Sequence, residues 1–286
     1  RSDKFNKLID KIILFKLNFE EIIVVDSSDI SHSKIVSKTC QKNNLKYFHT
    51  KASTSFQRNF GLTKIKDNTY VMFMDDDVEF YDDSFKNMER SINNNIENKN
   101  IIGFGFNQVE NVNFNFFDIL KKNLFVGYLD IYPTEPGKIA KSGWHSKILN
   151  LDKDIIADWV FTTVCIYKRE EIKNNRFDET FGEYSYLEDL DFSLNLTRDK
   201  KKIYISCSSK FKHPINIDRS NFKFGIIEVV NRYKIVKKYN LSKKLFFVGL
   251  FLRTLYSFLK SLSLNKRYLQ RALGNIYALS ILHKKN

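Results

Sequence analysis

The 286 residues include 43% hydrophobic and 15% aromatic residues, which is enough apolar side chain for a core and excludes an intrinsically disordered chain. Cys40, Cys165 and Cys207 form no CxxC pair and no zinc spacing, so they indicate free thiols in a reducing compartment. The N-terminal residues do not have the pattern of a signal peptide, and no uncharged apolar run of about 18 residues predicts a spanning helix.

The net charge of +14 is distributed unevenly along the chain. Residues 216–286 hold 15 Lys and Arg against 2 Asp and Glu, whereas residues 1–215 hold 32 against 31. A nearly neutral body is therefore followed by a basic tail. We predict a catalytic-type domain over residues 1–220 and a basic helical region over residues 221–286.

Helical and extended patterns alternate through the first part of the body. The periodicity predicts helices over residues 2–16, 31–43, 53–64 and 83–96, and strands over residues 21–26, 45–48, 70–74 and 101–106. This alternation is typical of an α/β fold with a mostly parallel sheet covered by helices. In such sheets ligands bind beyond the carboxyl ends of the strands.

The second part of the body is less regular. Residues 107–156 show no clear period and predict loops and short strands on the substrate side. After them we expect a strand over 158–167, a short helix over 169–173, a turn at 177–179, a helix that begins near residue 188 and a strand over 202–206.

The strand over 70–74 ends in three consecutive carboxylates, Asp75, Asp76 and Asp77. Adjacent carboxylates repel one another, and hard divalent cations such as Mg²⁺ bind carboxylate oxygens. Since alternate side chains of an extended segment point the same way, Asp75 and Asp77 can face one cation. An acidic surface loop is the alternative interpretation of these three residues alone.

Other polar residues follow neighbouring elements. Asp26 ends a predicted strand, and His213 follows the last one. Glu188, Asp189 and Asp191 fall in the first turn of a predicted helix, where the helix dipole alone favours acidic residues. These positions suggest a second acidic part of one site, or ordinary helix-start chemistry.

The order of these segments resembles family 2 glycosyltransferases of the GT-A fold. The resemblance is carried by residues 22–28 (IIVVDSS), 57–62 (QRNFGL), 73–78 (FMDDDV), Trp159 with the strand after it, 177–179 (FDE) and 186–191 (YLEDLD). The family's usual first strand, which ends in P-T-x-N-R, has no counterpart before Arg1. Thr162 and Thr163 stand where the family often has Ser-Gly or Gly-Gly.

The resemblance implies roles for individual residues. Asp77 would bind a divalent cation, Mn²⁺ or Mg²⁺, together with His213 and with Asp75, which also reaches toward the ribose. The nucleotide sugar would contact the residues Asp26, Ser28, Arg58, Asn59, Asp75, Asp76 and Arg219. Of the aspartate triplet, Asp76 is expected to matter least.

The same resemblance implies an inverting transfer to a glycan hydroxyl. Asp189 would be the general base, with Glu188 as the near alternative, while Trp159 and Asp191 would contact the acceptor. A sugar nucleotidyltransferase is the alternative enzyme, and a membrane- or nucleic-acid-binding scaffold is the alternative from another class.

The basic tail predicts about three helices within residues 222–283. In residues 245–260 the polar residues Gly249, Arg253, Ser257 and Lys260 form one narrow stripe on an otherwise apolar helix, with basic residues at both ends. This pattern is typical of a helix that lies in a membrane interface, and packing on the body or in an oligomer is the alternative. We expect a cytoplasmic, peripheral membrane protein with a lipid-linked glycan acceptor and no nucleic-acid partner.

Overall fold

The computed structural model describes residues 2–15, 17, 19–66, 69–110, 127–182, 184–214, 219–263 and 266–284. The chain divides into two compact units. The first unit comprises Arg1–Glu110 and Ile148–Pro214, and the second comprises Asn111–Lys147 and Ile215–Asn286. The predicted domain boundary near residue 220 stays a prediction. Arg1 and residues 111–126 of the predicted irregular region lie outside the described residues.

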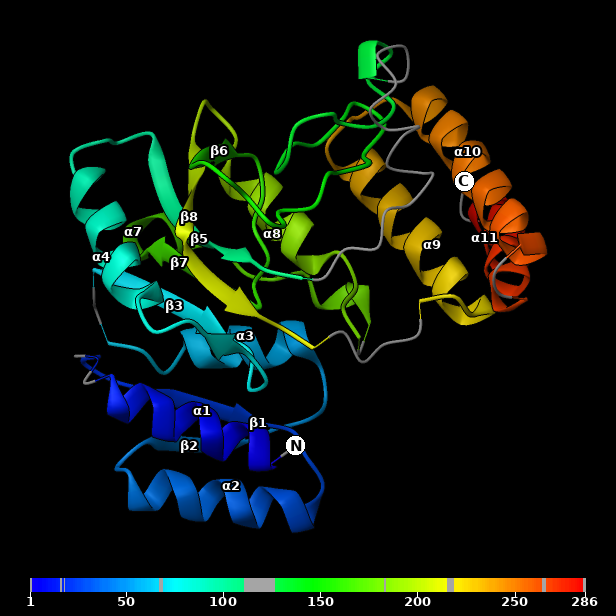
Figure 1. The fold of residues 1–286 in the computed structure, drawn as a ribbon. Helices are drawn as coiled ribbons and strands as arrows, with labels where there is room; N and C mark the ends of the chain where they lie inside the picture. The colour runs from blue at the N-terminus through cyan, green and yellow to red at the C-terminus, as the bar shows by residue number, and fades with distance from the viewer. Residues whose placement is uncertain are drawn as a thin grey trace. The chain divides into compact units, whose positions relative to one another are not determined.

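The first unit begins with a small parallel sheet. Strand β1 (Ile23–Asp26) pairs with β2 (Lys46–His49), so that Asp26 lies opposite His49 at the carboxyl ends of the two strands. Helix α1 (Ser2–Leu14) packs beside α2 (Ile30–Lys42), and the Thr39 hydroxyl donates to the Asn6 side chain over 2.8 Å. Figure 1 shows these four elements grouped at the N-terminal end of the ribbon.

A larger mixed sheet forms the centre of the first unit. Its strands lie in the order β3 (Tyr70–Met74), β7 (Val164–Lys168), β5 (Ile101–Gln108), β8 (Lys202–Lys212) and β4 (Glu79–Phe80), and β6 (Ile155–Ala157) pairs with β8 as well. Every residue of β5 is buried, as expected for a central strand covered on both faces. A side chain at Gly103 would collide with Tyr167 on β7, which explains a glycine in this strand.

The strand directions determine which loops meet. Strands β3 and β5 both run antiparallel to β7, and β5 runs parallel to β8. The carboxyl ends of β3, β5 and β8 therefore point to one edge of the sheet, where β7 begins. The loops after β3 and β8, and the segment before β7, meet at this edge.

Helices complete the first unit. They are α3 (Thr54–Leu62), α4 (Ser84–Asn94), α7 (Arg169–Ile172), the 3₁₀ turn Glu179–Phe181 and α8 (Glu188–Leu196). Ser53 caps α3 by accepting a hydrogen bond from the Phe56 amide over 3.3 Å. The core is rich in aromatic side chains, such as Phe80, Phe104 and Phe106.

Most of the elements expected from the sequence are confirmed. The α/β class is confirmed, and the larger sheet is mixed because β7, β4 and β6 run antiparallel to their neighbours. The three cysteines are free thiols. The strand predicted over 158–167 is wrong in its first half, because regular pairing begins only at Val164. Strand β8, in contrast, extends to Lys212, well beyond the predicted end.

The described residues of the tail form three helices, as predicted. They are α9 (Phe222–Lys238), α10 (Lys243–Ser263) and α11 (Arg267–Lys284). Residues from the segment 127–147 pack among them, and Tyr132 and Trp144 share a core with Tyr233, Phe246 and Leu250. Among the described residues, Lys243–Leu262 is the one stretch long and apolar enough to cross a membrane by length and composition.

One buried carboxylate organises the charges of the second unit. Glu228 on α9 forms ion pairs with Arg271, with Arg253 at 3.7 Å and with Arg232 at 3.8 Å. Arg232 also donates to the Gly143 carbonyl over 2.6 Å and lies over the Trp144 ring. Burial alone would raise the pKa of Glu228, but the charges of Arg271, Arg253 and Arg232 outweigh it and hold this pKa well below its usual range.

We therefore expect Glu228→Gln to destabilise the protein by about 3–5 kcal/mol, since it leaves buried guanidinium groups without their shared counterion. The free energy of unfolding can be measured by urea denaturation followed by tryptophan fluorescence. Because the folded pKa of Glu228 is depressed, its contribution is present above the unfolded value near pH 4.3 and is lost as the pH falls further.

The matched control is Glu135→Gln, which removes a carboxylate from the exposed surface of the same unit. This variant should change the free energy of unfolding by no more than about 0.5 kcal/mol. Equal effects of the two variants would show that the Glu228 cluster does not stabilise the fold.

Candidate functional site

The aspartate triplet lies directly after β3 at the carboxyl edge of the larger sheet. The Asp75 amide donates to the Thr163 carbonyl over 2.9 Å, which ties the triplet to the segment before β7. Asp77 Oδ1 lies 3.0 Å from His213 Nε2, and Asp77 Oδ2 lies 3.6 Å from Lys4 Nζ. The structure thus brings together Asp77 and His213, which are 136 residues apart in the sequence. Asp76 is half-buried beside them.

His213 is half-buried in an acidic environment. Burial alone would lower its pKa, but the hydrogen bond and charge of Asp77, with smaller contributions from Asp75 and Glu110, raise the pKa above its ordinary value. The imidazole therefore depends on the neighbouring carboxylates for its protonation state. A cation bound to Asp77 would change that balance.

Asp77 and His213 have donor types that divalent cations bind. Asp77 Oδ1 and His213 Nε2 lie 3.0 Å apart, in direct hydrogen-bond contact. Within the described residues no group of three His, Cys, Asp or Glu side chains converges on one point. These two residues fit part of a shell that leaves positions for substrate oxygens and water, as Mg²⁺ sites commonly do.

The second acidic cluster stands at the start of α8. Leu187, immediately before this helix, has φ +73°, and Ser185 has φ +48°. Left-handed backbone is unusual for a bulky, buried residue such as Leu187 and persists only where the surroundings enforce it. The Glu188 amide donates to the Ser185 carbonyl over 3.0 Å. This tight backbone fixes the direction in which Glu188 and Asp189 leave the helix.

Glu188 is buried and is held by two partners. Its Oε1 accepts hydrogen bonds from Arg58 and, over 3.1 Å, from the Thr162 hydroxyl. Burial, helped by the nearby charge of Asp189, raises the pKa of Glu188 to about 7 against the opposing charge of Arg58. Its Oε2 is buried and has no hydrogen-bond partner among the described residues.

Asp189 differs from Glu188 and Asp191 in exposure. Asp189 is half-buried, and its Oδ1 accepts from the Leu190 amide over 2.8 Å. Asp191 is buried in the first turn of α8, with its amide donating to the Leu187 carbonyl over 3.0 Å. Asp189 is therefore the most accessible carboxylate of this cluster.

Arg58 on α3 joins the two acidic clusters. Its Nη2 lies 3.0 Å from Asp75 Oδ1, and its Nη1 pairs with Glu188 Oε1. The guanidinium carbon lies 5.6 Å from the centre of the Phe177 ring, which supports the side chain from one face. The pKa of Arg58 is raised above its usual value because the charges of Glu188 and Asp75 outweigh the effect of burial.

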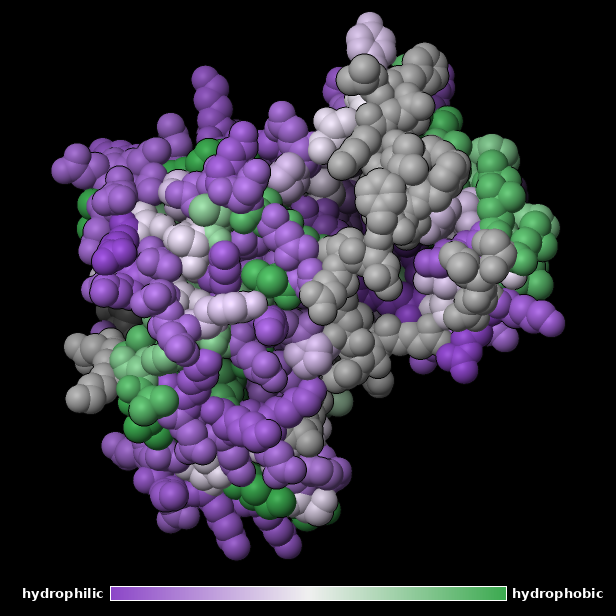
Figure 2. Space-filling model, in the orientation of Figure 1, coloured by the Kyte–Doolittle hydropathy of each residue, from purple (hydrophilic) through white to green (hydrophobic). Residues whose placement is uncertain are grey.

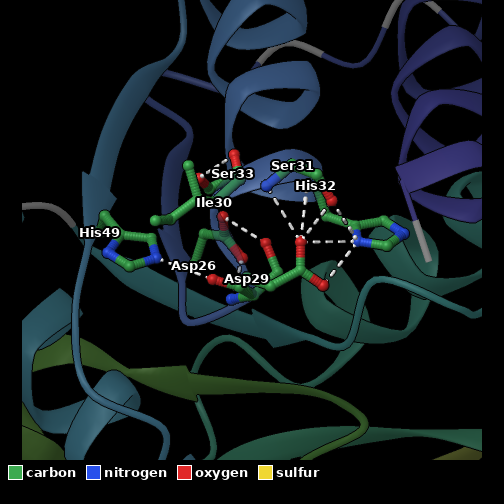
Figure 3. Close-up of polar contacts among 8 residues, drawn as sticks. Asp26, Asp29, Ile30, Ser31, His32, Ser33 and His49 are labelled. Carbon is green, nitrogen blue, oxygen red and sulfur yellow. Dashed lines mark hydrogen bonds and ion pairs between the residues drawn. The ribbon is translucent and has the colours of Figure 1, made fainter.

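Asp26 and Ser28, which are predicted to contact the nucleotide sugar, lie at the end of β1. Asp26 accepts from the Ser28 amide and hydroxyl, each over 2.9 Å, and from the Tyr47 hydroxyl over 3.0 Å. Next to it, Asp29 caps α2 by accepting from the amides of Ser31 and His32, as Figure 3 shows. The polar loop after β1 is thus held by its own hydrogen bonds.

Asn59 has a different place from its neighbour Arg58. Its amide group exchanges hydrogen bonds of 2.8 and 2.9 Å with the Phe177 backbone and donates to Glu179 over 3.0 Å. It connects α3 to the segment that precedes α8. Its contact with the nucleotide stays a prediction. In the structure its side chain holds the segment around Phe177 against α3.

The remaining predicted residues are Trp159, Asp191 and Arg219. Trp159 is buried with its ring 4.6 Å from that of Phe161, so it and the buried Asp191 do not present an exposed acceptor surface in this structure. Arg219 belongs to the second unit, where its carbonyl accepts from Arg271. The roles predicted for these three residues stay predictions.

Some residues of the site carried no sequence signal. Lys4 reaches Asp77 from α1, and nothing in the pattern of that helix distinguishes it from other surface lysines. Thr162 contacts Glu188 at a position where the sequence shows only a departure from the family pattern. Tyr47 reads as a strand residue, although its hydroxyl contacts Asp26.

Comparisons with known proteins bear on the family and the fold of the chain. Residues 3–138 match the family model described as Glycosyl transferase family 2. A search of curated proteins finds no match. Among solved structures the chain is similar to S. aureus TarS 1-349, with 18% identity, coverage of 97% of this chain and 76% of that chain, and a TM-score of 0.53. It is also similar to GalNAc-T7 with UDP, GalNAc and Mn²⁺, with 13% identity, coverage of 79% and 49%, and a TM-score of 0.49.

The likeness to TarS confirms the fold expected from the sequence motifs. The family match favours glycosyl transfer over the nucleotidyltransferase and scaffold alternatives. Residues 3–138 belong to glycosyl transferase family 2, and the chain is a glycosyltransferase with the GT-A fold.

Proposed function

We propose that the protein is an inverting, metal-dependent glycosyltransferase that moves a sugar from a nucleotide diphosphosugar to a hydroxyl of a glycan acceptor, such as a lipid-linked surface polysaccharide or oligosaccharide. The observation that carries this proposal is the pairing of Arg58 with both Asp75 and Glu188. It joins the predicted donor end and the predicted catalytic end into one site.

The donor end is built from Asp77, His213 and Asp75. Asp77 and His213 would hold Mn²⁺ or Mg²⁺, which acts as a Lewis acid on a bound diphosphate. Asp75, paired with Arg58, is held at the same strand end and is available to the ribose or to the metal shell. Asp26 and Ser28 would receive the base, with Arg58 and Asn59 forming the adjoining wall.

The catalytic end supplies a base for the attacking hydroxyl. Bond formation at the sugar C1 requires the acceptor oxygen to lose its proton while the bond to the diphosphate breaks. Asp189 is half-buried and accessible, whereas Glu188 is held by Arg58 and Thr162. We assign the base to Asp189 and a positioning role to Glu188. One carboxylate assisting attack from the face opposite the leaving group inverts the configuration at C1.

Asp189→Asn should lower turnover by about 10²–10⁴-fold, the usual contribution of a general base, and should leave donor binding unchanged. Turnover can be measured as donor hydrolysis with a panel of sugar nucleotides in the presence of Mn²⁺, and binding by titration calorimetry with the nucleotide sugar that is hydrolysed. The carboxamide keeps the shape of the side chain and removes its basicity.

The exposed Asp152 of the same unit provides the control variant, Asp152→Asn, which should retain wild-type turnover. A wild-type rate in Asp189→Asn, with loss of turnover in Glu188→Gln at unchanged stability, would transfer the role of base to Glu188.

The metal assignment predicts a loss that appears only in the presence of the cation. In calorimetry with nucleoside diphosphates, Mn²⁺ should strengthen binding to the wild type. In Asp77→Ala this gain should fall by at least about tenfold, because the variant removes a charged ligand from the shell.

For comparison, Asp82→Asn removes a neighbouring carboxylate whose side chain is 92% exposed, and it should keep the full effect of Mn²⁺. The metal assignment is wrong if the cation strengthens binding equally in Asp77→Ala and in the wild type.

A further inference from the structure

An exposed apolar face runs along α10 in the second unit. Its large side chains include Phe251, which is 66% exposed, and Leu262, which is 71% exposed. Together with Phe247, Leu255 and Phe258 they repeat at intervals of three or four residues and form one stripe of the helix. Figure 2 shows apolar side chains gathered over this helix.

Helix α11 adds a second exposed apolar stripe. Leu269, Leu273 and Ile276 follow the same spacing and are about half exposed. The two helices are fastened to each other, since Lys260 donates to the Tyr268 hydroxyl over 3.0 Å and Asn275 donates to Thr254 over 3.2 Å. Exposed apolar stripes of this length on two paired helices indicate an interaction site rather than ordinary scatter.

The opposite face of α10 is committed to the core of the second unit. Phe246 and Leu250 are buried there, and the Tyr132 hydroxyl donates to the Gly249 carbonyl over 2.7 Å. A side chain at Gly249 would collide with the Trp144 ring. Arg253, near the middle of the helix, pairs with the buried Glu228. Helix α10 therefore cannot cross a bilayer while it keeps these contacts, although its length and composition would allow it.

Charge decides between a lipid surface and a second copy of the chain. Residues 216–286 carry 15 basic and 2 acidic residues, and one of those acids is the buried Glu228. Lys243 and Lys244 begin α10, and Lys266 and Arg267 precede or begin α11. Two copies joined through this face would bring like charges together, whereas anionic lipid head groups complement them.

We propose that the exposed faces of α10 and α11 form a docking surface for an anionic lipid bilayer, in which the two helices lie in the plane of the interface. The apolar stripes enter the boundary between head groups and acyl chains, and the basic residues at the helix ends contact the head groups. The proposal does not depend on the glycosyl transfer proposed above. The cytoplasmic location expected from the sequence stays a prediction.

The test is sedimentation of the full chain with vesicles, without any nucleotide sugar. Wild-type protein should bind vesicles of phosphatidylcholine with 30% phosphatidylglycerol at least about tenfold more tightly than pure phosphatidylcholine vesicles, and 0.5 M salt should remove most of the difference. The double variant Phe251→Gln with Leu262→Gln should weaken binding to the anionic vesicles by at least about tenfold.

The control is Leu14→Gln with Ile30→Gln, which alters two side chains of the first unit that are 76% and 73% exposed. It removes equally exposed apolar groups and should leave vesicle binding unchanged. An equal loss in both double variants, or no binding of the wild type to anionic vesicles, would overturn the proposal.

Two further outcomes would also contradict it. Retention of the bound protein after an alkaline carbonate wash would indicate a spanning helix rather than an in-plane one. Self-association without lipid that the Phe251→Gln, Leu262→Gln variant abolishes, measured by analytical ultracentrifugation, would assign the face to a second copy of the chain.

Discussion

The candidate site depends on the positively charged guanidinium of Arg58, which lies between two groups of carboxylates. Arg58 pairs with Asp75 on one side and with Glu188 on the other. Glu188 is buried, and a buried charge that loses its partner costs about 3–5 kcal/mol. The two acidic clusters can therefore lie close together only because the guanidinium of Arg58, on α3, lies between them. Phe177 supports this group from one face, and Asn59, the next residue of α3, holds the Phe177 backbone in place.

The strand directions explain why the clusters meet at all. Asp75 follows β3, and His213 follows β8. Strands β3 and β5 both run antiparallel to β7, and β8 runs parallel to β5, so β3 and β8 end at the same edge of the sheet. The antiparallel β7 begins at that edge, so Thr162 and Thr163 face the loops instead of the far end of the sheet. Thr163 then fixes the aspartate triplet, and Thr162 fixes Glu188. Threonine at these two positions gives hydroxyl and backbone contacts that glycine could supply only in part.

Local patterns in the sequence predict the parts of this arrangement that depend on local physics. A continuous apolar run predicts β3 to the residue, and the polar residues after predicted strands single out Asp75, Asp77 and His213. Contacts between residues that are far apart in the sequence leave no such local pattern. The ion pair of Lys4 with Asp77 and the double pairing of Arg58 arise from packing, as does the placement of Tyr132 and Trp144 in the core of the second unit. The first half of the predicted 158–167 strand was wrong for a similar reason, because its apolar residues Trp159 and Val160 are buried by packing outside regular strand pairing.

The neighbours Glu188 and Asp189 show how environment separates two like groups. Both leave the first turn of α8, where the helix dipole favours negative charge. Glu188 points into a buried position, and there its pKa rises to about 7 despite Arg58. Asp189 stays half-buried and accessible. Under the proposed function these two acids would have different tasks, with Glu188 holding its partners and Asp189 accepting the proton. The left-handed backbone at Leu187 lies directly before both residues, at the point where α8 begins.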